Sequence, residues 1–264
     1  MSLLGIDVGT TGCKAAAFNK EGQQLASAYA EYDNLRPKPG WAELDAADVW
    51  GKVKDTVRKA TAQTASDPIE ALAVSSLGEA MVPVPADRQV LGPSILNFDV
   101  RGEEYLGSLG QVLADDHLYR INGNTLGNLY GLTKLLWIKE HQPDLYERAD
   151  QFLLWGSFVP FMFGAEPVVD YSLANRTLLF DLDRQAWSEE LLGLSGLDRA
   201  KLPDTALSGT VIGTVSDDVA AELGLPANVS IITGAHDQCA NAVGCGVIEE
   251  GQAVYGMGTF MCIT

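Results

Sequence analysis

The stretch LLGIDVGTTGCK, residues 3–14, predicts a short apolar strand, a tight turn of glycine and threonine, and a second strand that begins at Lys14. The turn at residues 9–12 places backbone N–H groups and two hydroxyls around one small concavity, which suits a phosphate. Asp7 precedes the turn and can hold a magnesium ion directly or through water, while Lys14 can reach a phosphate as a point charge. The turn joins two strands and lacks the Gly-Lys-Ser/Thr of a Walker loop. Taken alone, the stretch fits an ordinary glycine hairpin equally well.

A second informative carboxylate, Asp237, lies far along the chain. Residues 229–233 predict a buried strand because they are rich in β-branched side chains, and residues 238–247 predict a helix. Asp237 therefore lies at the carboxyl end of a strand and beside a helix N-terminus, where open α/β sheets place their ligand chemistry. An aspartate there can orient a hydroxyl group and accept its proton, and orientation is the main demand of phosphoryl transfer. The alternative is a helix N-cap, a role that Asp fills well.

The last residues, AVYGMGTFMCIT at 253–264, repeat the opening pattern of apolar strand, glycine–threonine turn and second apolar strand. Self-similar segments indicate a duplicated architecture. We therefore expect residues 1–250 to form one domain and residues 251–264 to begin a second domain.

Six spaced motifs give the chain a resemblance to a known family. They are GIDVGTTG (5–12), GWAELD (40–45), SSLGEA (75–80), FDVRG (98–102), DYSLANRT (170–177) and GAHDQ (234–238). Over essentially the whole chain they resemble the N-terminal domain of the FGGY carbohydrate kinases, the family of glycerol kinase, xylulokinase, gluconokinase and fuculokinase. The resemblance implies an α/β fold, a ribonuclease-H-like (actin-like ATPase) lobe with a mixed sheet covered by helices on both faces. It also implies that this lobe holds most of the sugar and that ATP lies in a cleft towards a second lobe.

The residues and the resemblance together assign roles in a kinase site. Asp237 is the expected catalytic residue, which orients and deprotonates a primary hydroxyl that attacks the γ-phosphate of Mg-ATP. Substrate contacts are expected from Gly78, Glu79, Asp99, Asp237 and Gln238. Phosphate contacts are expected from Thr10, Thr11, Gly12 and Lys14, and the resemblance adds Gly258 and Thr259 in a second phosphate turn. Asp7 is the expected ligand of Mg²⁺, directly or through water.

For three parts of the expected site, a purely structural role is an alternative to contact with the substrate. Glu79 could be a capping or salt-bridging residue. Asp99 and Arg101 could form an internal ion pair that fixes their loop instead of touching the substrate. Trp41 could stack on a sugar or anchor its own loop, and we favour the anchor.

The identity of the sugar is indicated only by residues 78–80. Xylulokinase-like members carry a histidine at the position of Glu79, and glycerol kinase-like members carry an arginine at the position of Gly78. Because this chain has Glu79 and Gly78 at these two positions, assignment as a xylulokinase or as a glycerol kinase is weakened. The Gly-Glu-Ala of this chain resembles the fuculokinases and favours a deoxy-ketohexose or a related ketose, fuculose- or xylulose-like.

Local patterns predict the supporting elements. Strands are expected at about 3–8, 14–19 and 25–32 as a meander, and at 71–74 as a buried strand. Asp45 is expected to cap a helix with an apolar stripe that contains Val49, Val53 and Val57. Ser216 and Gly224 are expected to bracket a later helix.

Composition excludes some partners. The chain has 35 acidic and 18 basic residues and a net charge of −17, which argues against nucleic acid and anionic membranes. The longest apolar stretch, residues 152–165, is shorter than the ~20 residues of a bilayer span, so we expect it to be core. In the absence of a signal peptide, reduced cysteines and a cytoplasmic protein are expected. The expected partners are a small sugar or polyol and ATP, and the oligomeric state is left open, a homodimer included.

The sequence thus predicts a carbohydrate kinase that uses ATP to phosphorylate a primary hydroxyl of a sugar or polyol. This 264-residue piece alone is expected to be inactive. Two rivals stay open. One is an actin-like ATPase that acts without a sugar, and the other is a catalytically silent sugar-binding lobe.

Overall fold

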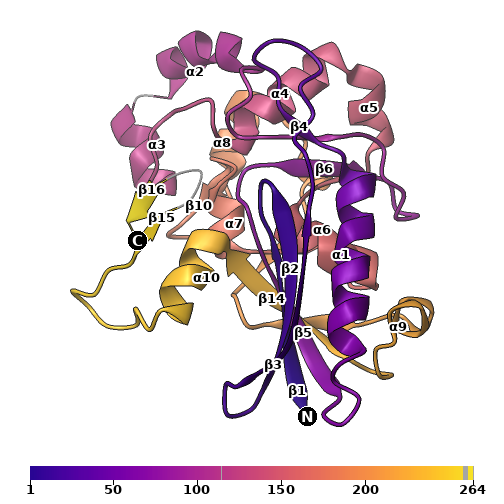
Figure 1. Cartoon of the computed structure of the whole chain (residues 1–264). Helices are drawn as coiled ribbons and strands as arrows, with labels where there is room; N and C mark the ends of the chain where they lie inside the picture. Colours follow the sequence, from indigo (N-terminus) through magenta and orange to yellow (C-terminus); the bar gives the residue numbers. More distant parts are fainter. Residues whose placement is uncertain (114, 258–260, 264) are drawn as a thin grey trace.

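The computed structural model describes residues 1–113, 115–257 and 261–263. At its centre is a six-stranded sheet in the order β13-β14-β5-β1-β2-β3 (Figure 1). Its strands are β1 (Ser2–Val8), β2 (Gly12–Asn19), β3 (Gln24–Glu31), β5 (Ile69–Ser76), β13 (Val211–Thr214) and β14 (Ser230–His236). β1, β2 and β3 form an antiparallel meander, whereas β5 lies parallel to β1 and β14 lies parallel to β5. The predicted mixed sheet is confirmed.

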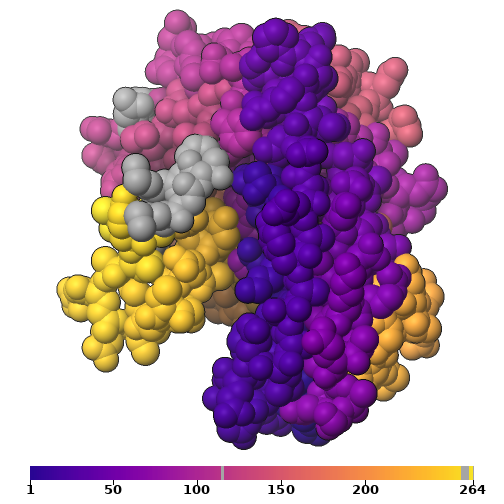
Figure 2. All heavy atoms as spheres, viewed as in Figure 1, coloured from indigo at the N-terminus to yellow at the C-terminus, as the bar shows by residue number. Residues whose placement is uncertain are grey.

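Helices lie on both faces of the sheet, as predicted, but they cover the two faces unequally. On one face, α1 (Ala46–Thr61), α6 (Trp155–Phe163) and α9 (Asp217–Leu223) pack into a single core. On the other face α10 (Asp237–Gly244) packs against β14 and β5 and leaves part of the sheet open. Figure 2 shows a hollow between the yellow segment that includes α10 and the indigo meander.

Alternation along β1 explains why one face is covered. Leu4, Ile6 and Val8 are at most 2% exposed, whereas the alternate residues between them face outward and are exposed. The covering helix begins where predicted, because the Asp45 side chain accepts hydrogen bonds from two backbone N–H groups of its first turn. Its residues Val49, Val53 and Val57 are at most 1% exposed. Each fully buried aliphatic side chain contributes roughly 1.5–3 kcal/mol.

The chain between β5 and β14 builds a second apolar core, which includes Trp137, Phe152 and Phe180. The helices there are α2 (Leu106–Val112), α3 (Asp115–Asn122), α4 (Gly131–His141), α5 (Pro143–Arg148), α7 (Tyr171–Asn175) and α8 (Glu189–Ser195), with 3-10 turns at Glu103–Tyr105 and Arg199–Lys201. The short strands there are β6 (Met81–Val84), β7 (Ser94–Ile95), β8 (Gln151–Leu154), β9 (Val168–Asp170), β10 (Phe180–Asp181), β11 (Ala186–Trp187) and β12 (Asp204–Ala206). β4 (Glu43–Leu44), which precedes α1, pairs with β7. Residues 152–165 are buried almost throughout, as predicted.

The end of the chain forms a separate two-stranded sheet of β15 (Tyr255–Met257) and β16 (Met261–Ile263). These strands match the repeated strand–turn–strand pattern. The turn residues Gly258 and Thr259 lie outside the described residues, so their predicted phosphate contacts stay predictions. Within the described part of the chain, no helix has the length and apolar character needed to cross a membrane.

Candidate active site

The turn between β1 and β2 is held by a single tyrosine. Gly9 N donates a hydrogen bond to Gly12 O at 2.9 Å, which closes the turn. The hydroxyl of Tyr32 lies 2.7 Å from the carbonyl oxygen of Gly9 and 2.9 Å from that of Gly12. Thr11 O accepts a further bond from Tyr32 N at 3.1 Å. These contacts fix the turn in one shape. The sequence alone did not point to Tyr32, because no local pattern links it to the turn.

Asp7 lies on the open side of the sheet, beside Lys14 on β2 and Ser75 on β5. Ser75 Oγ donates a hydrogen bond to Asp7 Oδ1 at 3.1 Å. Although Asp7 is exposed on the open face of the sheet, its pKa is raised, chiefly because neighbouring protein atoms displace part of the water around its carboxylate. The Ser75 hydrogen bond and the Lys14 charge oppose this rise in pKa, and the negative charge of Asp237 adds to it. A carboxylate in this state is stabilised by a nearby cation.

Asp237 is the first residue of α10, and its neighbour His236 occupies the N-cap position. The alternative that Asp237 is the N-cap is therefore wrong, because the N-cap lies one residue earlier. No hydrogen bond from the described residues reaches Asp237 Oδ1, and His236 Nε2 lies 3.2 Å from it. Burial raises the pKa of Asp237, which makes it a stronger base than an ordinary aspartate. Burial, and then the charge of Arg176, lower the pKa of His236 to about 4, so this histidine is neutral at pH 7.

Strand β5 brings the two carboxylates into one neighbourhood. Asp7 pairs with Ser75, and Ser75 pairs with Ala235 on β14. Two strand spacings separate the backbones of Asp7 and Ala235 by about 10 Å, and Asp237 follows two residues later. The charge of Asp237 consequently reaches Asp7. Segments far apart in the sequence thus meet at the carboxyl edge of the parallel strands.

Two neighbouring cavities share the junction between β14 and α10. The larger one, of about 650 Å³, lies over the open face of the sheet and is lined in part by Asp7 and Lys14. We call it the sheet-face cavity. The smaller one, of about 360 Å³, contains Asp237, and we call it the Asp237 pocket. It gathers five of the predicted site residues: Thr10, Gly78, Glu79, Asp237 and Gln238. Its wall also contains three further polar residues, Asn97, Arg176 and His236.

Glu79 enters the Asp237 pocket from a strained turn. Ala80 N donates to Gly78 O at 2.6 Å, which closes a three-residue turn, and Glu79 at its centre has a φ of 60°. A left-handed backbone at a residue other than glycine costs of order 1–3 kcal/mol and is enriched at functional sites. A Cβ at position 78 would lie 3.0 Å from His236 Nε2 and 3.2 Å from Arg176 Cγ, so a larger residue there would need both side chains to shift by a few tenths of an ångström.

Arg176 holds the Glu79 side chain. Its Nε donates to Glu79 Oε1 at 2.6 Å, and its Nη2 donates to the same oxygen. Burial raises the pKa of Glu79, while the charge and hydrogen bonds of Arg176 oppose that rise. The salt-bridging role expected as an alternative for Glu79 is thus present, in a residue that also lines the pocket.

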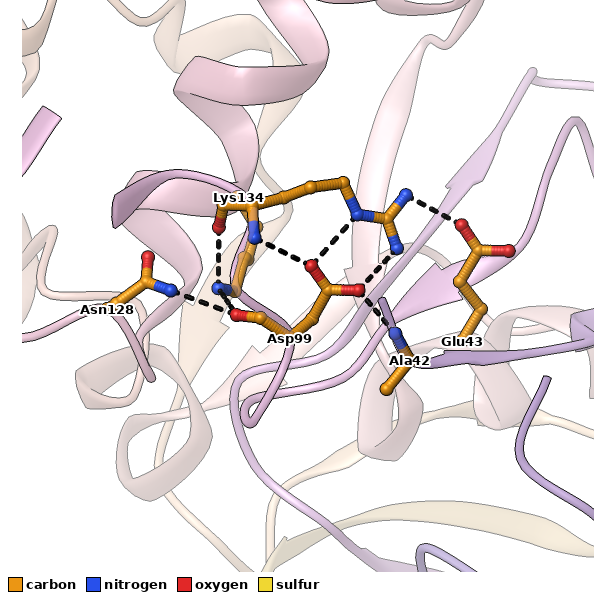
Figure 3. Close-up of polar contacts among 6 residues, drawn as sticks. Ala42, Glu43, Asp99, Asn128 and Lys134 are labelled. Carbon is orange, nitrogen blue, oxygen red and sulfur yellow. Dashed lines mark hydrogen bonds and ion pairs between the residues drawn. The ribbon is translucent and has the colours of Figure 1, made fainter. Parts of the chain in front are cut away.

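Asp99 is placed in an internal ion network and lines neither cavity (Figure 3). Its side chain accepts hydrogen bonds from the backbone N–H groups of Ala42 and Arg101 and from the Arg101 guanidinium, which also pairs with Glu43 at 2.6 Å. Lys134 Nζ donates to the carbonyl oxygens of Asp99 and Arg101 at 2.7 and 2.8 Å. Burial alone would raise the pKa of Asp99, but these hydrogen bonds lower it. The carboxylate of Asp99 fixes its own loop, which favours the internal ion pair that the sequence left open, and the expected substrate contact stays a prediction.

The remaining predicted residues lie at the edges of the site. Trp41 stacks against the Arg101 guanidinium at 4.0 Å, which makes it an anchor. Thr11 is exposed, and Gly12 is buried in close contact with Tyr29. Within the described residues neither Thr11 nor Gly12 lines one of the two cavities.

The sheet order, the helices on both faces and the carboxylates at the strand ends define a lobe of the ribonuclease-H-like, actin-like ATPase fold. A model of the N-terminal domain of the FGGY family of carbohydrate kinases matches residues 2–244. The chain therefore belongs to the FGGY family of carbohydrate kinases.

Individual relatives agree with this assignment. The chain is 30% identical to the autoinducer-2 kinase of Salmonella choleraesuis (strain SC-B67) over 265 residues, which cover 98% of this chain and 50% of that protein. It is 28% identical to the xylulose kinase of Escherichia coli (strain K12) over 257 residues, 97% of this chain and 52% of the other. A crystal structure of gluconate kinase from Lactobacillus acidophilus shares the fold with a TM-score of 0.92 at 24% identity, over 99% of this chain and 53% of that one. The chain spans about half the length of the relatives it matches.

Proposed function

We propose that this chain is the sugar-binding lobe of an ATP-dependent kinase that phosphorylates a primary hydroxyl of a sugar or polyol in the cytoplasm. The observation that carries the proposal is the convergence of Asp237, Glu79 and Thr10 on one pocket, beside the cavity that contains Asp7. Family membership supports the reaction class.

In this proposal Asp237 orients the acceptor hydroxyl and takes its proton. The raised pKa of Asp237 favours that role, and its Oδ1 is free among the described residues to accept a hydrogen bond from the hydroxyl. Glu79 and Gln238 contact other hydroxyls of the sugar, and Gly78 lets it approach the backbone. The transferring phosphates are held by Thr10, Thr11, Gly12 and Lys14, and by Gly258 and Thr259 from the second turn.

Asp7 fits a magnesium ion. The described residues contain no cluster of three or more His, Cys, Asp or Glu side chains that would form a complete metal site. Mg²⁺ does not need such a cluster, since it is usually held by one or two carboxylates, water and substrate phosphates. The raised pKa of Asp7 supports this fit. Asp7 would hold the ion directly or through water, and the ion would supply neutralisation of phosphate charge.

Within this reaction class we propose a ketose, fuculose- or xylulose-like. The Gly-Glu-Ala at residues 78–80 supports this choice, as does the similarity to a xylulose kinase. We further propose that residues 1–250 form the sugar-binding domain and that residues 251–264 begin a second, nucleotide-side domain. The isolated 264-residue chain is then expected to bind nucleotide poorly and to transfer little phosphate.

A coupled ADP-release assay of the natural protein that contains this chain tests the proposal, with ketoses, polyols and aldonates as acceptors. Sugar-dependent ADP release is the expected result. ATP hydrolysis that no sugar changes would instead indicate an actin-like ATPase. Sugar binding without turnover would indicate a catalytically silent lobe, and appreciable turnover by the isolated 264-residue chain would contradict the two-lobe arrangement.

A further inference from the structure

The Asp237 pocket contains a cation that is already neutralised. Among the described residues of its wall, Arg176 is the only one with a positive charge at pH 7, because His236 is neutral. The Arg176 guanidinium donates to Glu79 through Nε and Nη2, and its face lies over the Tyr130 ring at 4.9 Å. The Nε–Nη2 edge and the face of the guanidinium are thus engaged by Glu79 and Tyr130. With Asp237 ionised, the pocket carries a net negative charge.

The two buried side-chain atoms of this pocket that receive no hydrogen bond from the described residues are acceptors. Asn97 Oδ1 and Asp237 Oδ1 are both buried and receive no hydrogen bond from the described residues. The orientation of the Asn97 amide is supported by its hydrogen bond to Glu79, which requires its nitrogen to face the carboxylate. A ligand must therefore bring donors to these two oxygens. Hydroxyl groups can donate, whereas an ionised carboxylate only accepts.

We propose that the Asp237 pocket selects neutral polyhydroxylated substrates and rejects sugar acids, and that the Glu79–Arg176 pair is the determinant. This inference rests on the proposed function. When the primary hydroxyl of an aldonate reaches Asp237, its carboxylate at the other end of the carbon chain enters the same small pocket. There the carboxylate of the ligand meets Glu79, which is already paired with Arg176. It also meets Asn97 Oδ1, to which an ionised carboxylate cannot donate a hydrogen bond. Like charges brought together at a binding site cost several kcal/mol, so neutral sugars are expected to bind at least about tenfold more tightly.

Isothermal titration calorimetry on the natural protein tests this selectivity, with D-xylulose and xylitol as neutral probes and D-xylonate and D-gluconate as acidic probes. Glu79→Gln keeps the shape of the side chain but removes its charge, which leaves Arg176 uncompensated. This variant is expected to bind the acids at least about tenfold more tightly than the wild type does, relative to the neutral probes. The double variant Glu79→Gln/Arg176→Gln is expected to lose that gain. Glu222→Gln, which removes the same charge from a surface pair with Lys54, is expected to leave the selectivity unchanged.

Asn97→Leu provides a second test that does not depend on the ion pair. It removes the free acceptor, so affinity for the neutral probes is expected to fall about tenfold while affinity for the acids does not fall. Circular dichroism establishes that each variant is folded. Wild-type protein that prefers the acids, or that binds neither neutral probe, overturns the inference, and so does a folded Glu79→Gln variant with unchanged selectivity. Binding decides these outcomes separately from turnover, so a protein that binds neutral sugars without transferring phosphate refutes only the proposed function.

Discussion

The hydroxyl of Tyr32 lies 2.7 Å from the carbonyl oxygen of Gly9, although the two residues are 23 positions apart. This contact ties the segment after β3 to the proposed phosphate turn. Tyr32→Phe removes it with little change in shape, and a lost hydrogen bond of this kind costs about 1 kcal/mol. We expect the free energy of unfolding in urea to fall by that amount and the KM for Mg-ATP of the natural protein to rise. The exposed Tyr119→Phe serves as the control, and unchanged values for both quantities in Tyr32→Phe would show that the turn does not need the hydroxyl.

Replacement of Asp237 tests the proposed base directly. Asp237→Asn keeps a hydrogen-bonding side chain but cannot accept the proton of the acceptor hydroxyl. General base catalysis contributes roughly 10²–10⁴-fold, so kcat is expected to fall by that factor while sugar affinity, measured by calorimetry, is largely kept. Asp217→Asn, in the first turn of α9, is the matched control. A variant with wild-type turnover would remove Asp237 from the mechanism.

The pKa shifts of Asp237 and His236 predict the pH dependence of kcat. Asp237 must be ionised to act, and burial raises its pKa above the usual 3.8. Activity is therefore expected to be lost, as the pH falls, at a higher pH than an ordinary aspartate would give. Because the pKa of His236 is lowered to about 4, no acid limb near pH 6.5 is expected from this histidine. A limb near 6.5 that disappears in His236→Gln would contradict that description.

Local patterns were enough to predict the elements that frame the site. The Asp45 cap, the helix between Ser216 and Gly224 and the opening meander were all predicted, because capping residues and apolar periodicity act over a few positions. The start of α10 was missed by one residue. That difference matters, since it moves the N-cap from Asp237 to His236, and Asp237 Oδ1 receives no hydrogen bond from the described residues.

Long-range contacts could not be predicted in the same way. Arg176 and Glu79 are 97 positions apart, and only the folded chain shows that they form one pair. The sequence left Asp99 with two roles, and tertiary packing favours the internal ion pair because Arg101 folds back onto Asp99 with its guanidinium over the rings of Trp41 and Trp137. Spaced motifs therefore located the pocket, whereas the partners that set its charge came from the structure.

The internal network around Asp99 predicts a large loss of stability when its cation is removed. Arg101 is 4% exposed and neutralises both Asp99 and Glu43. Arg101→Met would leave two buried carboxylates without their partner, which typically costs about 3–5 kcal/mol. Urea unfolding is expected to show a loss in this range. Arg58→Met, which breaks surface pairs, is the control, with an expected loss of at most about 1 kcal/mol. A loss of that small size in Arg101→Met would show that the network contributes little.

Lys134 predicts an unusual rise of stability with pH. Its ammonium group is buried, and this burial lowers its pKa from 10.5 to about 8. Between these two values the unfolded chain binds a proton that the folded chain has released, so the contribution of Lys134 to the free energy of unfolding increases with pH, by at most about 1.4 kcal/mol per pH unit. The difference in unfolding free energy between wild type and Lys134→Met is therefore expected to shift in favour of the wild type from pH 8 to 10.5. Lys139→Met, which removes an exposed lysine from the same helix, is the control. The comparison uses only the difference between variants, in which effects common to all of them cancel. A constant difference for Lys134→Met would mean that the ammonium group keeps its proton in the folded state.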